Sequence, residues 1–269
     1  MEAFFLQADG GGGDSRFCLH HPARGAAQGG VLYVHPFADE MNKARRMAAL
    51  QSRSLSDAGW SVLQIDLRGC GDSSGNFEEA SWDDWVADVL RGWHWLRKRV
   101  RGPVWVWGLR LGCVLAVAAA RREAQMRHLM LWQAPASGKQ QLQQFLRLRM
   151  ASAMLDGQKG VVESLRRELD AGRTVEVAGY ALAPGLAHGI EEATMAPPPG
   201  PGQMKWLEVS PDAQNSISSL GKSTTAKWRE AGWTVDAAGV GGPAFWQTSE
   251  IEVVPSLIDA SALPVAMPR

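Results

Sequence analysis

Short apolar runs alternate with longer amphipathic segments along most of the chain. The runs are rich in Val, Leu and Trp, a composition typical of strands that are buried on both faces. The segments between them repeat apolar residues at helical spacing, as Trp82, Trp85, Val89 and Trp93 do. This alternation predicts an α/β fold with a mostly parallel sheet that helices cover on both faces. The predicted strands are residues 31–34, 60–67, 103–107, 128–132, 205–209 and 234–238.

Predicted helices connect these strands, and several have recognisable ends. Ser81 and Asp84 stand three residues apart, as in a capping box at a helix start. Gly59 is placed to end the preceding helix. The segments predicted as helices are 42–58, 81–100, 113–123, 217–231 and 250–260.

The alternation of strands and helices stops between the fourth and fifth predicted strands. Residues 140–155 and 161–169 have the pattern of two amphipathic helices with many arginines, and residues 175–182 are a short apolar segment. A stiff Pro/Gly connector follows at 197–202. We therefore expect one core domain, from residues 1–137 and 203–269, with residues 138–202 inserted into it as a cap.

The amino-acid composition argues against several classes of protein. The chain has 269 residues, 45% of them hydrophobic, which is enough for a sizeable core. Its 28 basic and 28 acidic residues cancel, and this balance argues against general nucleic-acid binding. Cys18, Cys70 and Cys113 are odd in number and far apart, so neither a disulfide framework nor a zinc cage is expected. No metal or other cofactor is expected.

The N-terminal segment and the apolar runs bear on where the protein resides. Residues 1–7 contain no basic stretch and no long apolar stretch, so no signal peptide is expected. The apolar run 113–120 is too short to cross a bilayer, and Arg121 and Arg122 follow it. We therefore expect a cytoplasmic protein without a transmembrane segment.

Three glycine-containing or turn-forming motifs follow predicted strands. Residues 108–112 are Gly-Leu-Arg-Leu-Gly, with the glycine spacing of the G-x-S-x-G nucleophile elbow, but Arg110 stands where that motif has its serine. His35-Pro36-Phe37 follows the first predicted strand. Residues 66–75, Asp-Leu-Arg-Gly-Cys-Gly-Asp-Ser-Ser-Gly, run on from the second.

Together these stretches resemble the α/β-hydrolase superfamily and imply its fold. His35-Pro36-Phe37 is similar to the family's oxyanion turn, and residues 66–75 to its D-x-R-G-x-G-x-S loop. A closer resemblance is to the exosortase A system-associated hydrolases, type 2, which are bacterial proteins linked to exopolysaccharide production. That resemblance implies a nominal hydrolase acting on an ester, thioester or acyl bond. It is carried by HPFADEMNKARRMAALQ, DLRGCGDSSG, WGLRLG, GKQQLQQFLRLRMAS and FWQTSEIE.

The resemblance also implies where a catalytic triad would lie, and the residues depart from it. Arg110 takes the nucleophile position, and a guanidinium that stays protonated cannot attack a carbonyl. Asp212 could take the acid position after the fifth predicted strand. No histidine follows His188, and Ala244 stands where the family's histidine is expected. Standard serine hydrolysis is therefore not expected. His35 could act as a base from the oxyanion turn, or it could simply hold that turn.

If residues 108–112 form the elbow, Arg110 lies at the start of the next helix and needs a partner. The cation opposes the helix dipole at a cost of about 0.3–1 kcal/mol. An internal carboxylate, from Asp39, Glu40 or Asp212, could offset this cost. A bound anion could also do so.

An anion at this position would be held in part by amides of the polypeptide near Phe37 and Leu111, and Ser137 stands near the expected pocket mouth. Asp39 and Glu40 could alternatively form a carboxylate pair for acid–base chemistry, or simply complement a helix dipole.

Three functions remain open from the sequence. The protein could be an enzyme that uses non-standard residues. It could be a non-catalytic pseudohydrolase that binds an anionic metabolite or a lipid-linked precursor. It could also be a scaffold that meets a protein partner or a membrane surface through the arginine-rich helix 140–155 of the cap.

Overall fold

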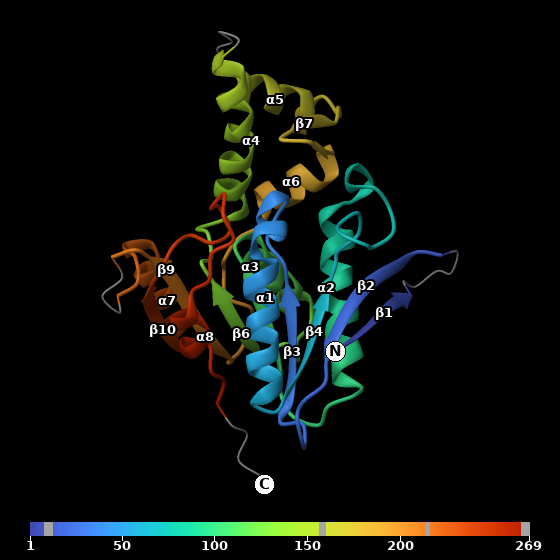
Figure 1. Cartoon of the computed structure of the whole chain (residues 1–269). Coiled ribbons are helices and arrows are strands. Elements are labelled where there is room, and N and C mark those ends of the chain that lie inside the picture. The colour runs from blue at the N-terminus through green and yellow to red at the C-terminus, as the bar shows by residue number, and fades with distance from the viewer. Residues whose placement is uncertain (8–12, 156–159, 213–215, 265–269) are drawn as a thin grey trace.

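The computed structural model describes residues 1–7, 13–155, 160–212 and 216–264. Its main sheet has eight strands. They are β1 (Glu2–Gln7), β2 (Ser15–His21), β3 (Gly29–Val34), β4 (Trp60–Ile65), β5 (Val104–Leu109), β6 (His128–Trp132), β9 (Gln203–Ser210) and β10 (Thr234–Gly241). Their spatial order is β1-β2-β4-β3-β5-β6-β9-β10 (Figure 1).

Most neighbouring strands of this sheet are parallel. The pairs from β4 across to β10 all run in the same direction. Only the β1–β2 hairpin and its junction with β4 are antiparallel. The predicted α/β class with a mostly parallel sheet is therefore confirmed.

Helices cover both faces of the sheet. They are α1 (Asp39–Asp57), α2 (Trp82–Arg97), α3 (Leu111–Arg122), α7 (Ser219–Glu230) and α8 (Pro255–Ala260). Strand β3 shows how the two cores arise, because Leu32 and Val34 join the apolar cluster beneath α2 and α3. Val31 and Tyr33 point the other way, into the cluster beneath α1 and α8. Alternation along one strand thus supplies two cores.

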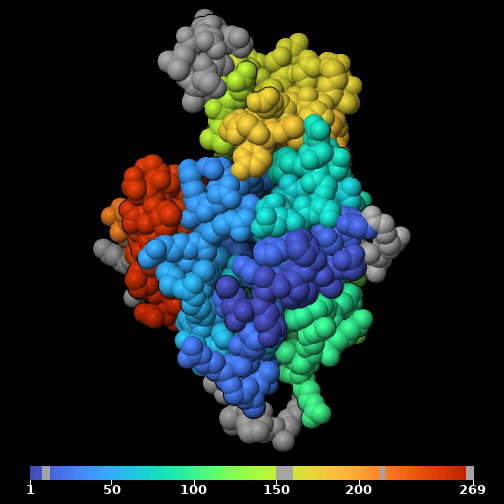
Figure 2. Space-filling model, turned by 45° about the vertical axis from the view of Figure 1, so that its right-hand side comes forward, coloured from blue at the N-terminus to red at the C-terminus, as the bar shows by residue number. Residues whose placement is uncertain are grey.

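The elements between β6 and β9 lie above the carboxyl edge of the sheet (Figure 1). They are α4 (Gly138–Leu155), α5 (Val161–Asp170), the hairpin β7 (Val175–Val177) and β8 (Tyr180–Leu182), and α6 (Pro184–Glu192). Their two ends meet, because Ser137 bridges to Thr194 and the Gly138 amide donates to the Ala193 carbonyl at 3.0 Å. In space-filling form these elements form an upper lobe (Figure 2).

Four elements differ most from the pattern-based expectation. The β1–β2 hairpin was not predicted, since β1 is largely exposed and β2 mixes apolar with charged positions. Helix α6 was also missed, although Pro184 at its first turn is a helix-start signal. The predicted helix 250–260 begins only at Pro255, because a residue that precedes proline is disfavoured in helical conformation.

Candidate functional site

The turn between β5 and α3 has the geometry that its glycines predict. Arg110 is the single residue between strand and helix, and its backbone has φ 55° and ψ −121°. A Cβ on Gly108 would lie 2.5 Å from the Gly112 carbonyl oxygen. A Cβ on Gly112 would lie 2.3 Å from the Val34 carbonyl oxygen. Both glycines are therefore needed for this close approach, and the strand–turn–helix elbow is formed.

The side chain of Arg110 is buried in an ion pair. Its Nε donates to Glu40 Oε1 at 3.2 Å, and its Nη2 donates to Gln144 Oε1 at 2.9 Å. The guanidinium carbon lies 5.7 Å from the centre of the Trp246 ring. Only 9% of the arginine side chain is exposed. The partner of the buried cation is thus an internal carboxylate supplied by the first turn of α1.

The other two carboxylates considered from the sequence lie elsewhere. Asp39 pairs with Lys43 one turn along α1, at 3.0 Å. Asp212 is exposed just beyond β9, and its carboxylate forms no ion pair with Arg110. Of these three carboxylates, Glu40 is the one that pairs with Arg110.

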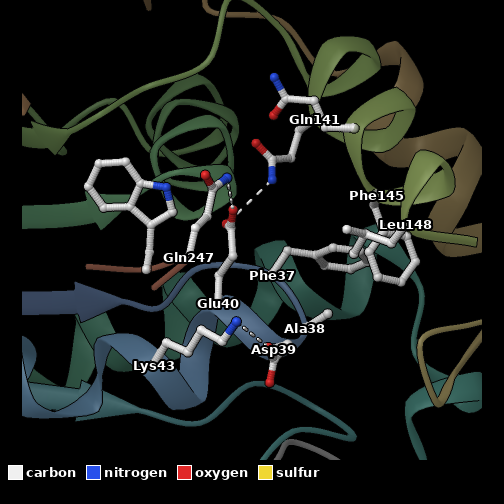
Figure 3. Close-up of a pocket in the computed structure, with 11 residues that line it drawn as sticks. Phe37, Ala38, Asp39, Glu40, Lys43, Gln141, Phe145, Leu148 and Gln247 are labelled. Carbon is white, nitrogen blue, oxygen red and sulfur yellow. Dashed lines mark hydrogen bonds and ion pairs between the residues drawn. The ribbon is translucent and has the colours of Figure 1, made fainter. Parts of the chain in front are cut away.

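Glu40 is surrounded by side-chain amides. Gln141 Nε2 donates to Glu40 Oε2 at 3.4 Å, and Gln247 Nε2 donates to Glu40 Oε1 at 3.5 Å. Burial raises the pKa of Glu40 above its ordinary value, and the Arg110 charge opposes that rise. Helix α1, the cap helix α4 and the loop after β10 thus meet at one carboxylate (Figure 3).

The histidine of the oxyanion-like turn is fully engaged by backbone groups. His35 Nδ1 donates to the Pro36 carbonyl at 2.8 Å, and His35 Nε2 accepts from the Leu67 amide at 3.3 Å. Burial lowers the pKa of His35 and favours the neutral ring that this pattern requires. The imidazole thus ties the turn after β3 to the loop after β4, and neither nitrogen is left to act as a base.

The other residues predicted to bind a ligand are Phe37, Leu111 and Ser137, and each lies in a different environment. Phe37 lies in the cavity wall and packs against Phe145 of α4, with ring centres 4.7 Å apart. Leu111 is buried in the core beneath α3. Ser137 Oγ accepts from the Gln140 amide at 3.3 Å, at the start of α4. Of these, only Phe37 faces the cavity.

A cavity of about 380 Å³ lies beside the Arg110–Glu40 pair. This size falls within the range of small-molecule sites. One part of its wall is apolar and includes Phe37, Phe145 and Leu148, and another carries side-chain amides (Figure 3). The full lining is Phe37, Ala38, Asp39, Glu40, Lys43, Gln141, Gln144, Phe145, Leu148, Trp246 and Gln247.

Sequence reasoning missed eight of the residues that line this cavity, and four of them contact Arg110 or Glu40. Gln141 and Gln144 come from the cap helix, and Trp246 and Gln247 come from the loop after β10. The Gln-rich start of the cap helix and the FWQ stretch were visible signals. Ala244, which stands where the family's histidine is expected, packs against the apolar cluster beneath α1 and α8. Within the described residues, no group of three His, Cys, Asp or Glu side chains is arranged to hold a metal ion.

Comparison with known proteins agrees with this geometry. The family model described as serine aminopeptidase, S33 (Hydrolase_4) matches residues 25–168, more than half of the chain. The fold and the elbow define an α/β-hydrolase. The chain belongs to this S33 serine aminopeptidase-like family of α/β-hydrolases.

Curated relatives match over a shorter stretch. The thermostable monoacylglycerol lipase of Bacillus sp. (strain H-257) is 33% identical over 91 residues, which is 34% of this chain and 34% of that protein. The lysophosphatidylserine lipase ABHD12 of Danio rerio is 31% identical over 93 residues, covering 34% of this chain and 23% of the relative. The matches therefore span about a third or less of the relatives' length.

Solved structures share the fold along almost the whole chain. Est1E from Butyrivibrio proteoclasticus, solved with ferulic acid, aligns with a TM-score of 0.68 and 14% identity, covering 96% of both chains. Mouse α/β-hydrolase domain-containing protein 10 aligns with a TM-score of 0.56 and 16% identity over 90% of both chains. At this identity the likeness establishes the α/β-hydrolase fold. None of the described helices is long and apolar enough to cross a membrane.

Proposed function

We propose that this protein is an α/β-hydrolase family member that binds a ligand beside its elbow and does not hydrolyse esters by serine chemistry. The observation that carries the proposal is Arg110 in the elbow conformation, buried against Glu40. A guanidinium is permanently protonated and has no lone pair to attack a carbonyl. This cation stands at the elbow position where a serine hydrolase carries its nucleophile.

The surroundings of the elbow support the same proposal. A serine hydrolase needs a base within hydrogen-bond reach of its nucleophile. The loop after β10 presents Trp246 and Gln247 to the cavity, and neither an indole nor an amide takes up a proton near neutral pH. His35 is engaged by two backbone groups. An acid at Asp212 would therefore have no histidine to orient.

The chemical nature of the cavity supports a ligand with an apolar part. Phe37, Phe145 and Leu148 form an apolar wall. The relatives named as lipases for monoacylglycerol and lysophosphatidylserine suggest that this part is an acyl chain. The nominal hydrolase class would then reflect the ancestry of the fold, and the site would bind a ligand without hydrolysing it.

The test is turnover of 4-nitrophenyl acetate, 4-nitrophenyl butyrate and a short-chain acyl thioester by wild type, Arg110→Ala and Arg110→Ser. We expect all three proteins to match the buffer background, because restoring the serine does not restore its base. A fluorophosphonate probe should leave the intact mass of the wild type unchanged, while an active serine esterase assayed in parallel gains the adduct. Wild-type turnover that falls in Arg110→Ala would show a working site built on the arginine and would overturn the proposal.

An anionic ligand is an alternative that the sequence left open. Such a ligand would compete with Glu40 for Arg110, because Glu40 Oε1 already accepts from Arg110 Nε. Its binding should therefore strengthen in Glu40→Gln. Equal or weaker binding of an anion by Glu40→Gln would argue against this alternative.

The cellular role is a further part of the proposal. The resemblance to the exosortase A system-associated hydrolases, type 2, supports a role in exopolysaccharide production, which the protein would serve from the cytoplasm. Arg147, Leu148 and Arg149 are exposed together on the cap helix, which supports a second role for the cap as a contact surface for a protein or a membrane. Deleting the gene in its host and measuring exported polysaccharide tests the pathway. If the amount of exported polysaccharide does not change, the proposed role in exopolysaccharide production is wrong.

A further inference from the structure

One face of the cap helix α4 forms part of the cavity wall. The helix contributes Gln141, Gln144, Phe145 and Leu148 to the lining. These positions follow the spacing i, i+3, i+4 and i+7, which places the four side chains on one side of a helix. The shape of the cavity therefore depends on how this face of α4 is held against the core domain.

Arg110 connects this face of the cap helix to the core. Two nitrogens of its guanidinium donate to partners on different elements, Nε to Glu40 Oε1 at 3.2 Å and Nη2 to Gln144 Oε1 at 2.9 Å. The planar guanidinium suits this arrangement, because it presents several N–H donors in fixed directions. One side chain thus contacts both the first turn of α1 and the cap helix.

Glu40 adds two more contacts to the same group. Its Oε2 accepts from Gln141 Nε2 of the cap helix at 3.4 Å, and its Oε1 accepts from Gln247 Nε2 at 3.5 Å. Glu40 therefore lies between α4 and the loop that follows β10 (Figure 3). The Arg110–Glu40 pair joins the elbow, α1, α4 and that loop, and the last three of these line the cavity.

A serine at the elbow could not make the contact with the cap helix in this way. A serine hydroxyl is attached directly to Cβ, whereas the guanidinium of arginine lies at the end of a methylene stem. A hydrogen bond from a charged donor is also stronger than one between neutral groups. The Arg110 side chain is only 9% exposed, so water screens its interactions little.

We propose that Arg110 is a positioning residue: together with Glu40, it holds the cap helix against the core and so fixes one wall of the ligand cavity. The elbow, which presents the nucleophile in a serine hydrolase, here presents the cation that fastens α4. This role rests on the proposed binding function and names what keeps the cavity in shape. When the Arg110–Gln144 hydrogen bond is removed, α4 opens locally more often.

The experiment is hydrogen–deuterium exchange of the purified full chain without ligand, followed by mass spectrometry of its peptides. Gln144→Met removes the acceptor and leaves the Arg110–Glu40 pair in place, so no buried charge loses its partner. We expect the amides of residues 141–148 to exchange at least about tenfold faster than in wild type, the effect of losing one hydrogen bond to a charged group. Amides of α7, whose local openings leave this hydrogen bond intact, should exchange at the wild-type rate.

The neighbouring glutamine provides a matched control. Gln143 is exposed on the same helix and does not line the cavity. Gln143→Met makes the same chemical change with a similar helix propensity, and it should leave the exchange of residues 141–148 unchanged.

A second background tests whether Gln144 acts through Arg110. In the double variant Arg110→Met/Glu40→Gln neither member of the ion pair is charged, so no buried charge is left without its partner. Exchange of residues 141–148 should already be fast in this protein, and adding Gln144→Met should accelerate it no further. Equal acceleration by Gln144→Met in both backgrounds would show that its effect does not pass through Arg110.

Two further results would overturn the inference. One is a wild-type exchange rate at residues 141–148 in Gln144→Met. The other is equal acceleration of α4 and α7, which would mean that the substitution loosens the whole protein. The measurement uses neither ligand nor substrate, so its outcome is independent of whether the cavity binds a ligand and of whether the protein hydrolyses esters.

Discussion

Ala38 and Arg110 adopt the same unusual backbone conformation just before two helices that follow neighbouring parallel strands. Ala38 has φ 52° and ψ −130°, and Arg110 has φ 55° and ψ −121°. Each residue immediately precedes a helix, α1 after β3 and α3 after β5, and these strands are hydrogen-bonded to each other. The two sharp turns bring the first turn of α1 to the elbow, so that Glu40 meets Arg110. The buried ion pair therefore depends on backbone strain at both positions.

Replacing Ala38 by glycine should stabilise the protein. A residue with a Cβ rarely adopts this positive φ, whereas glycine does so without strain. We expect Ala38→Gly to raise the free energy of unfolding by about 1 kcal/mol in urea denaturation. Ala49→Gly, in the interior of α1, should lower it by about 1 kcal/mol. A loss in Ala38→Gly as large as that in Ala49→Gly would show that Ala38 is not strained.

Glu40 should make stability depend on pH in an unusual direction. Burial raises its pKa above the ordinary value of 4.5 despite the neighbouring Arg110. A carboxyl group with a raised pKa binds more protons in the folded state than in the unfolded state. Its contribution to stability is therefore complete at low pH and is lost as the pH rises through the folded-state pKa.

The variant Glu40→Gln cannot titrate at this position and should isolate that effect. We expect its free energy of unfolding to rise relative to wild type as the pH increases from about 4 to about 7. Asp39→Asn makes the same change at the adjacent, more exposed carboxylate and serves as the control. If the attraction of Arg110 outweighs the cost of burial, the difference between Glu40→Gln and wild type will run in the opposite direction.

Local patterns predicted most of the fold and the frame of the site. The strand predicted at 128–132 coincides with β6, and the glycine spacing predicted the elbow around Arg110. These features depend on neighbouring residues in the chain, which is what periodicity and turn motifs record. The β1–β2 hairpin was not predicted because its outer strand, β1, is largely exposed and shows no clear alternation of buried and exposed residues.

The composition of the cavity could not be predicted in the same way. Gln141 and Gln247 reach Glu40 from positions 101 and 207 residues away in the chain. Glutamines on an amphipathic helix have the pattern of a solvated face, and nothing local reveals that a second element covers them. The sequence therefore left Arg110 with three carboxylates to choose from. Only the folded chain selects Glu40.

A second buried ionic cluster, around Asp88 of α2, should contribute strongly to stability. Its carboxylate is fully buried and accepts from Arg16 Nε at 2.7 Å, the Arg68 amide at 2.8 Å and Arg91 Nη1 at 2.6 Å. Removing one partner of a buried ion pair leaves the other charge uncompensated. We expect Asp88→Ala to lower the free energy of unfolding by about 3–5 kcal/mol.

Asp83 of the same helix provides the comparison for Asp88. It pairs with Arg122, but its side chain is 76% exposed. Asp83→Ala should therefore cost no more than about 1 kcal/mol in the same denaturation experiment. If the two variants lose similar amounts of the free energy of unfolding, the charge of Asp88 does not stabilise the cluster around it.

The three cysteines should be inert to thiol reagents in the folded protein. Burial raises the pKa of Cys18 to about 12 and raises the pKa of Cys70 and Cys113 as well. At pH 8 a thiol with such a pKa is ionised to only about one part in ten thousand, and the thiolate is the reactive form. Cys113, directly after the elbow turn, also donates its S–H to the Gly108 and Trp132 carbonyls.

We therefore expect Ellman's reagent to modify no cysteine of the native protein at pH 8 and all three after denaturation in guanidinium. Cys113 is the informative position, because a helix start can lower a thiol pKa and could have made this residue a nucleophile. Rapid native labelling that disappears in Cys113→Ala would identify a reactive thiol at the elbow. Such a thiol would supply the nucleophile that Arg110 cannot, and covalent catalysis would then have to be reconsidered for this site.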